Sequence, residues 1–300
     1  VLIINGFDRV SAPASFKSDD ETVAGFNNML DAGVPYLNDY SFIGAQHEFR
    51  REIPWMDDDA PGFGASFANY EDKVIAGNSF DYPAVHGAAL LAMGYDFVSA
   101  SAGSVMARKT SLNNYRYVDF IMGKQAKTKM GRGAMPAKYA VFPMALQNAI
   151  TDYLNNVKNG SVIISGANVG RDLFDNVDVT EQDKKFATDV LKYRFMTHYA
   201  STDGKVKSVA NPYGFTGKYN FVTAMNPVKY AVETADAIVP VGAGAFTIFR
   251  YAENNISAGI AFMNETNNSK GVVLGFPVES LDDALQIEAM FKEVFRFFEK

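Results

Sequence analysis

Residues 162–170 read Val162-Ile163-Ile164-Ser165-Gly166-Ala167-Asn168-Val169-Gly170, an apolar run followed by a Gly-x-Asn-x-Gly turn. The apolar run predicts a buried strand, and the flanking glycines permit the sharp strand-to-helix turn called a nucleophile elbow. Such an elbow requires Ser or Cys at its apex, where this sequence has Asn168. Because the chain contains no Cys, a thiolate mechanism is excluded. The sequence therefore indicates the scaffold of an enzyme more clearly than the chemistry of one.

The composition predicts a folded globular chain. Of the 300 residues, 48% are hydrophobic and 13% are aromatic, which is enough for a substantial core. The net charge of -6 argues against a nucleic-acid-binding surface, because a phosphate backbone favours clustered Lys and Arg. No run of about 18 apolar residues is present. We therefore expect neither a nucleic-acid partner nor a membrane span.

The sequence starts directly on an apolar run, Val1 to Ile4, without an initiator Met, a signal peptide or a polar leader. A first strand with no lead-in is typical of a domain that follows a linker. We therefore expect a fragment of a longer polypeptide, with neighbouring domains of the same chain as partners.

Short apolar runs alternate with helical patterns, as is typical of a mainly parallel sheet with helices on both faces. The predicted central strands are 1–4, 97–100, 118–122 and 162–164, and the predicted helices are 83–93, 142–157, 181–193 and 281–298. In the last helix, apolar residues at three- and four-residue spacing predict a face that docks on the sheet. Asp282 and Asp283 are expected in its first turn, where carboxylates favour the helix dipole.

Two regions depart from this alternation. Residues from about 199 to 275 are β-rich, with strands predicted at 246–251, 257–262 and 272–274, which we interpret as antiparallel strands added to the parallel sheet. Residues from about 9 to 78 are crowded with Gly, Pro, Asp and aromatic residues and predict an aromatic and acidic insertion. We expect one α/β domain spanning residues 1–300.

Ligands of open α/β sheets bind at the carboxyl ends of the strands. This rule selects Asn5, Asp8 and Arg9 after the first strand, Ser99, Ser101 and Ser104 after the second, and Asn168, Arg171 and Asp172 after the elbow strand. Asn5, Asp8, Arg9, Asn168 and Arg171 are the candidate ligand-binding residues of this set. Asp8 and Arg9 can hold a polar substrate, or they can satisfy loop backbone groups and each other.

Three of these residues are also candidate catalytic groups. Ser101 is a candidate nucleophile if His86 or His198 approaches it, although small residues at that position fit a tight turn and a helix start equally well. Asp8 and Asp172 are candidate acid/base residues, with a residue of the run 57–59 as an alternative, and the role requires two carboxylates facing each other across a cleft.

The most unusual local composition surrounds the only Trp of the chain, in Trp55-Met56-Asp57-Asp58-Asp59. Aromatic rings stack on sugar rings and carboxylates accept hydrogen bonds from hydroxyls, so Trp55, Asp57 and Asp58 are candidate glycan-binding residues. Clustered Asp oxygens can alternatively hold Ca²⁺, although the EF-hand spacing is absent. A third interpretation is a small satellite core beside a solvated turn. No other cofactor is indicated, and the three scattered His predict no zinc site.

Three features together resemble the class I glutamine amidotransferase-like superfamily. They are the opening strand at 1–6, the elbow at 162–170, and the stretch 271–281 that runs from an apolar strand toward the terminal helix. The resemblance implies a flavodoxin-like three-layer sandwich with a mainly parallel sheet. In active members a Cys at the elbow apex works with a His and an acid. Since Asn168 holds that position here, the resemblance does not imply amidotransferase or protease activity.

A closer resemblance covers nearly all 300 residues. It is carried by Asn5-Gly6-Phe7-Asp8-Arg9-Val10-Ser11 and by residues 57–66, 75–83 and 165–170. These stretches are similar to the α/β domain of exported multidomain Bacteroidota proteins that are labelled xanthan lyase or N-acetylmuramoyl-L-alanine amidase. The resemblance implies a secreted, periplasmic or cell-surface location and a glycan or cell-wall polysaccharide as partner. Three hypotheses remain open: a catalytically silent glycan-binding module, a carbohydrate-active lyase or hydrolase that uses carboxylates, and a structural spacer.

Overall fold

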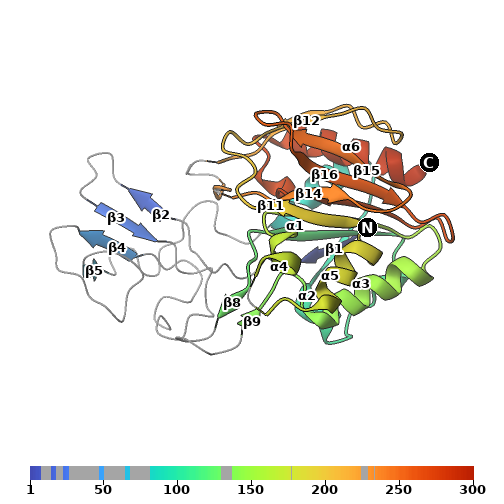
Figure 1. Cartoon of the computed structure of the whole chain (residues 1–300), viewed down its shortest axis with the longest axis horizontal. Coiled ribbons are helices and arrows are strands. Elements are labelled where there is room, and N and C mark those ends of the chain that lie inside the picture. The colour runs from blue at the N-terminus through green and yellow to red at the C-terminus, as the bar shows by residue number, and fades with distance from the viewer. Residues whose placement is uncertain are drawn as a thin grey trace.

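The computed structural model of the chain describes residues 1–7, 82–129, 137–176, 178–223, 229–232 and 234–300. Within the region predicted as an insertion it also describes four strands, β2 (Ser15–Lys17), β3 (Val23–Phe26), β4 (His47–Arg50) and β5 (Ala65–Phe67). These four strands form an antiparallel sheet of their own (Figure 1).

The described residues form an α/β arrangement around a mixed nine-stranded sheet. Its parallel half has the order β6 (Val98–Ser101), β1 (Leu2–Asn5), β7 (Tyr117–Gly123), β10 (Ser161–Gly166) and β17 (Lys270–Leu274). The antiparallel half continues with β16 (Ser257–Met263), β15 (Ala245–Tyr251), β12 (Lys205–Ser208) and β13 (Lys218–Asn220). Along the chain, the parallel strands are therefore arranged 2-1-3-4-5, and the strand order reverses between β1 and β7.

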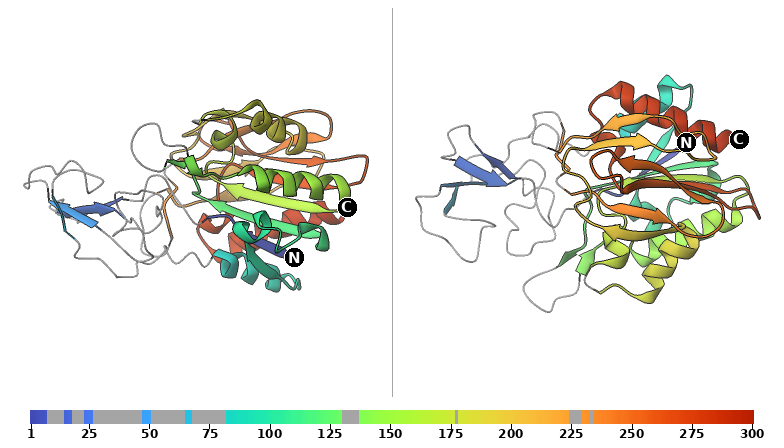
Figure 2. Two further views of the ribbon diagram at one scale, coloured as in Figure 1. Left: turned by 90° about the horizontal axis from the view of Figure 1, so that it is seen from below. Right: turned by 45° about the horizontal axis from the view of Figure 1, so that its top comes forward.

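Helices cover both faces of the sheet. The side chains of the central strands alternate between the two faces, so each face carries an apolar cluster that must be covered. Ile3 packs in the cluster beneath α1 (Tyr82–Ala92) and α6 (Ala284–Glu299). Its neighbours Leu2 and Ile4 pack in the other cluster, beneath α3 (Met144–Asn156). Figures 1 and 2 show the resulting three layers, with α6 on one side of the sheet and α3 on the other. No helix in the described ranges is long and apolar enough to cross a membrane.

Shorter elements complete the described fold. They are α2 (Ala102–Met106), α4 (Arg171–Phe174), α5 (Glu181–Lys185), a π-helical turn at Phe186–Val190, 3₁₀ turns at Leu112–Asn114 (η3) and Val278–Ser280 (η5), and the strand pairs β8 (Thr128–Lys129) with β9 (Ala137–Tyr139) and β11 (Tyr193–Thr197) with β14 (Ala237–Pro240).

The predicted central strands and the helices at 83–93 and 142–157 are present with small shifts at their ends. The helix predicted at 181–193 is wrong at its end. Lys192 has a φ of 61°, a left-handed conformation in which a right-handed helix cannot continue, and Tyr193 already begins β11. The alternating pattern of β11 is too short to stand out after a helical segment.

Two predictions about the C-terminal part also need correction. The strand predicted at 272–274 is antiparallel to β16 but parallel to β10, so it closes the parallel half of the sheet as β17. Asp282 and Asp283 precede α6 and are not in its first turn. The Asp283 carboxylate accepts a hydrogen bond from Gln286 N at 2.8 Å and caps the helix.

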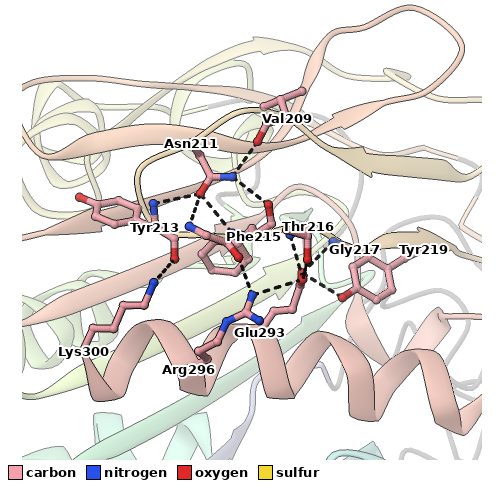
Figure 3. A network of polar contacts seen from close by, with 11 residues as sticks. Val209, Asn211, Tyr213, Phe215, Thr216, Gly217, Tyr219, Glu293, Arg296 and Lys300 are labelled. Carbon is pink, nitrogen blue, oxygen red and sulfur yellow. Dashed lines mark hydrogen bonds and ion pairs between the residues drawn. The ribbon is translucent and has the colours of Figure 1, made fainter.

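Hydrogen bonds to Glu293, on α6, hold the β-rich extension against this helix (Figure 3). Its carboxylate accepts hydrogen bonds from the backbone N–H and the hydroxyl of Thr216, both at 2.8 Å, from Gly217 N at 3.1 Å and from the Tyr219 hydroxyl at 3.1 Å. The loop itself is shaped by Asn211, whose Oδ1 accepts from three successive backbone N–H groups at 213–215. The antiparallel half of the sheet is thus tied to the helix that covers the parallel half.

We expect Glu293→Gln to lower the free energy of unfolding by about 1–3 kcal/mol, because the amide nitrogen cannot accept hydrogen bonds from the donors that face it. The matched control is Glu288→Gln on the same helix, whose partner Lys292 is largely exposed; its effect should stay below about 0.5 kcal/mol. Chemical denaturation measures both variants. Equal effects would contradict the role given to Glu293.

Candidate functional site

The predicted elbow is present at the carboxyl end of β10. The strand ends at Gly166, residues 167–170 form the turn, and α4 begins at Arg171. A Cβ on Gly166 would lie 2.7 Å from the Cβ of Met122, and a Cβ on Gly170 would lie 2.7 Å from a ring carbon of Phe195. The turn is where the sequence pattern predicts it, but the reason for both glycines is the close approach of neighbouring segments.

Asn168, at the apex of the elbow, is held by the neighbouring strand-end loop. Its Nδ2 donates hydrogen bonds to Gln125 O at 3.0 Å and to Lys124 O at 3.3 Å, and only 8% of the residue is exposed. Lys124 and Gln125 directly follow β7. The amide thus joins the ends of β10 and β7, and its donor capacity is used within the protein.

An Asp–His pair lies beside the elbow. β11 and β14 run antiparallel with Thr197 opposite Ala237, so the residue after β11, His198, meets the residue before β14, Asp236. Asp236 Oδ1 accepts a hydrogen bond from His198 Nδ1 at 2.8 Å. Asp236 Oδ2 accepts from Gly170 N at 2.7 Å and from Arg171 N at 2.8 Å. One fully buried carboxylate therefore fixes both the elbow and the imidazole.

The partners of His198 define its tautomer. Its Nε2 faces the Arg171 guanidinium at 3.2 Å, and since Arg only donates, Nε2 is the acceptor and the ring proton lies on Nδ1. Burial raises the pKa of Asp236, while the hydrogen bonds from His198, Arg171 N and Gly170 N act in the opposite direction. In an Asp–His–nucleophile triad, Nε2 would face the attacking atom. Here a guanidinium takes that position.

A surface hollow of about 320 Å³ adjoins this pair. Arg171 and Asp175 line one side of it, and residues 195–199 line the other. The hollow is therefore built from the segment after the elbow and from the end of β11.

The other sequence-predicted residues in the described part lie at separate places. Asn5 ends β1, and its Oδ1 accepts a hydrogen bond from Phe7 N at 3.2 Å. Ser101 caps α2 by accepting from Ser104 N at 3.1 Å. Asp172 is buried, and its Oδ2 accepts from Phe142 N at 3.0 Å. Among the predicted ligand-binding and catalytic residues that the structure describes, only Arg171 contacts the His198–Asp236 pair, and Asn168 lies in the turn directly before it.

His86 belongs to a different buried centre. Its Nδ1 lies 2.7 Å from Asp119 Oδ2 and its Nε2 lies 3.3 Å from Glu279 Oε2. Burial lowers the pKa of His86, but the two carboxylates outweigh it and raise the pKa to about 10. The imidazolium therefore links α1, β7 and η5. Both of its ring nitrogens are engaged there, so neither is available to Ser101.

The remaining candidates lie outside the described residues. They are Asp8, Arg9, Trp55, Asp57 and Asp58, together with the acidic run 57–59 considered as a Ca²⁺ site. The rule that ligands bind at the carboxyl ends of parallel strands does not select Asp236. It also does not place His198 beside the elbow. The sequence signal that marks Asp236 is its position directly before the apolar run at 237–239.

No protein-family model matches the sequence, and no curated protein is similar to it in sequence. Among solved structures, the fold is similar to a β-galactosidase from the haloarchaeon Halorubrum lacusprofundi, with 13% identity over 73% of this chain and a TM-score of 0.45. It is also similar to an exo-β-1,4-mannosidase from Opitutaceae bacterium strain TAV5, with 9% identity over 77% of this chain and a TM-score of 0.41. The chain spans 26% and 33% of the lengths of these two enzymes.

A glutamine amidotransferase from Thermotoga maritima is similar over 70% of this chain and 87% of its own length, with 13% identity and a TM-score of 0.35. At these identities the likeness concerns the fold, and it assigns no residue of this chain a role.

The buried carboxyl of Asp172, on the helix after the elbow, makes a contribution to the free energy of unfolding that depends on pH. Burial raises the pKa of its carboxyl from 3.8 to about 6, against the hydrogen bonds from the backbone of Phe142 and Val141. Because the folded-state pKa is above the unfolded one, this contribution is complete below about pH 4 and is lost as the pH rises through about 6.

We therefore expect the stability difference between wild type and Asp172→Asn to shift against the wild type by on the order of 1–3 kcal/mol between pH 4 and pH 7. Urea denaturation of both proteins across this range measures it. A difference that stays constant with pH would show that the carboxyl does not titrate in this way.

Proposed function

We propose that the chain is a catalytically silent glycan-binding module of an exported protein that processes polysaccharide or the cell envelope. Within this proposal the fold is a flavodoxin-like sandwich of the class I glutamine amidotransferase-like type. The support for the fold is the 2-1-3-4-5 order of the parallel strands together with the elbow at the end of the fourth of them, β10.

The observation that carries the proposal is the state of the elbow. Its apex holds an amide that cannot attack, and that amide is bound to two backbone carbonyls. The neighbouring imidazole faces a guanidinium, and no hydroxyl of the described residues hydrogen-bonds to its ring. The parts that a hydrolase uses for bond cleavage are thus occupied by structural hydrogen bonds, whereas the rim beside them remains open as a hollow.

The position of Asp172 also favours binding over carboxylate catalysis. Its side chain is buried and hydrogen-bonded to the backbone before α3, while the hollow is lined by Arg171 and Asp175 of the same turn. An acid/base pair would need both carboxylates to face the substrate.

Isothermal titration against xanthan, peptidoglycan fragments and common plant glycans tests this function. We expect saturable binding of at least one of these glycans, and no new reducing ends or unsaturated products after prolonged incubation with it. Complete absence of binding would favour the structural-spacer hypothesis. Product release that disappears in Asp8→Asn or Asp172→Asn would instead establish carboxylate catalysis and overturn the proposal.

A further inference from the structure

Tyr199 has an unusual backbone conformation at the edge of the hollow beside the elbow. Its φ is 56°, in the left-handed region that bulky residues rarely adopt. Such a conformation is strained and persists where the surrounding structure fixes it, which is common at ligand-binding sites. Here the residues on either side are fixed, because His198 is bonded to Asp236 and Ala200 N donates to Ala235 O at 2.8 Å.

The ring of Tyr199 is held at the surface rather than packed in the core. It contacts the imidazole of His198 edge-on, with ring centroids 4.7 Å apart and planes at 68°, and 70% of the residue is exposed. Met196, which lines the same hollow, is also 57% exposed. Because the Tyr199 ring is exposed, packing in the core does not offset the strain of its backbone. This arrangement points to a surface on which a ligand stacks.

The polar groups of the hollow combine a donor with an acceptor. Arg171 uses Nη1 for His198, and its remaining guanidinium N–H groups have no hydrogen-bond partner among the described residues. Asp175, one turn later, places an exposed carboxylate on the same hollow. A hydroxyl both donates and accepts, so two neighbouring hydroxyls of a sugar ring suit such a pair of planar side chains. A carboxylate on the ligand would face both the Arg171 cation and the Asp175 anion, so this pair offers an acidic sugar no net attraction.

We infer that this hollow binds one neutral pyranose unit of a glycan, with Tyr199 as the stacking platform and Arg171 and Asp175 as partners of its hydroxyls. The inference rests on the proposed glycan-binding function and adds the site and the class of sugar. A volume of about 320 Å³ is at the lower end of the range for small-molecule pockets, which suits a single ring.

Titration of the whole chain with cellohexaose, mannohexaose, xylohexaose and the acidic tetragalacturonate tests the inference. We expect wild type to bind at least one neutral hexasaccharide more tightly than tetragalacturonate. Tyr199→Ala should weaken that binding about tenfold, and Tyr199→Phe should retain it within about twofold, since the ring is kept. Phe246→Ala, at a part-exposed aromatic residue on β15, is the matched control and should bind like wild type.

Tyr199→Gly separates a ligand-binding role from a structural one. Glycine relieves the left-handed backbone, so the melting temperature should rise by about 2 °C while binding falls as in Tyr199→Ala. Unchanged affinity in Tyr199→Ala and Tyr199→Gly, with wild type still binding a neutral glycan, would overturn this site and leave the proposed function standing. Tighter binding of tetragalacturonate would overturn the class of sugar. If wild type binds none of these four probes but still binds xanthan or peptidoglycan fragments, this inference is overturned and the proposed function stands; if it binds no glycan in either titration, the proposed function falls as well.

Discussion

The carboxylate of Asp236 holds together the segments that form one rim of the sheet. Its side chain binds the elbow after β10 and the imidazole after β11, and its backbone N–H donates to Gly275 O at 2.9 Å, directly after β17. The Tyr251 hydroxyl of β15 donates to its carbonyl at 2.7 Å. Because the residue is fully buried, each of these groups depends on the others for its hydrogen bonds, and loss of one leaves a buried polar group unpaired.

This constraint decides what the elbow can do. The Asn168 side chain ties the turn to the loop after β7 and Asp236 accepts from its backbone N–H groups, so the polar atoms of this strand-to-helix turn serve the fold. The same bonds set the position of Arg171 and of the end of β11, which together border the open hollow. A rigid rim with displayed aromatic and polar side chains is suited to ligand binding, because little ordering is needed when the ligand arrives.

The sequence predicts the parts of the fold that have local patterns. Buried parallel strands are continuous apolar runs, and the elbow is marked by two glycines four residues apart, so both are predicted correctly. The Asp236–His198 pair has no such pattern, because its members are 38 residues apart and meet only through the pairing of β11 with β14. Likewise, no local signal shows that α4 turns Asp172 inward while Asp175 reaches the surface.

The most direct test of the central role of Asp236 is the substitution Asp236→Asn, followed by denaturation and by amide hydrogen exchange at Gly170 and Arg171. A carboxamide presents donors where His198 Nδ1–H or the two backbone N–H groups require an acceptor. We expect the free energy of unfolding to fall by about 3–5 kcal/mol and exchange at both amides to accelerate. A loss below about 1 kcal/mol with unchanged exchange at these two amides would contradict the account.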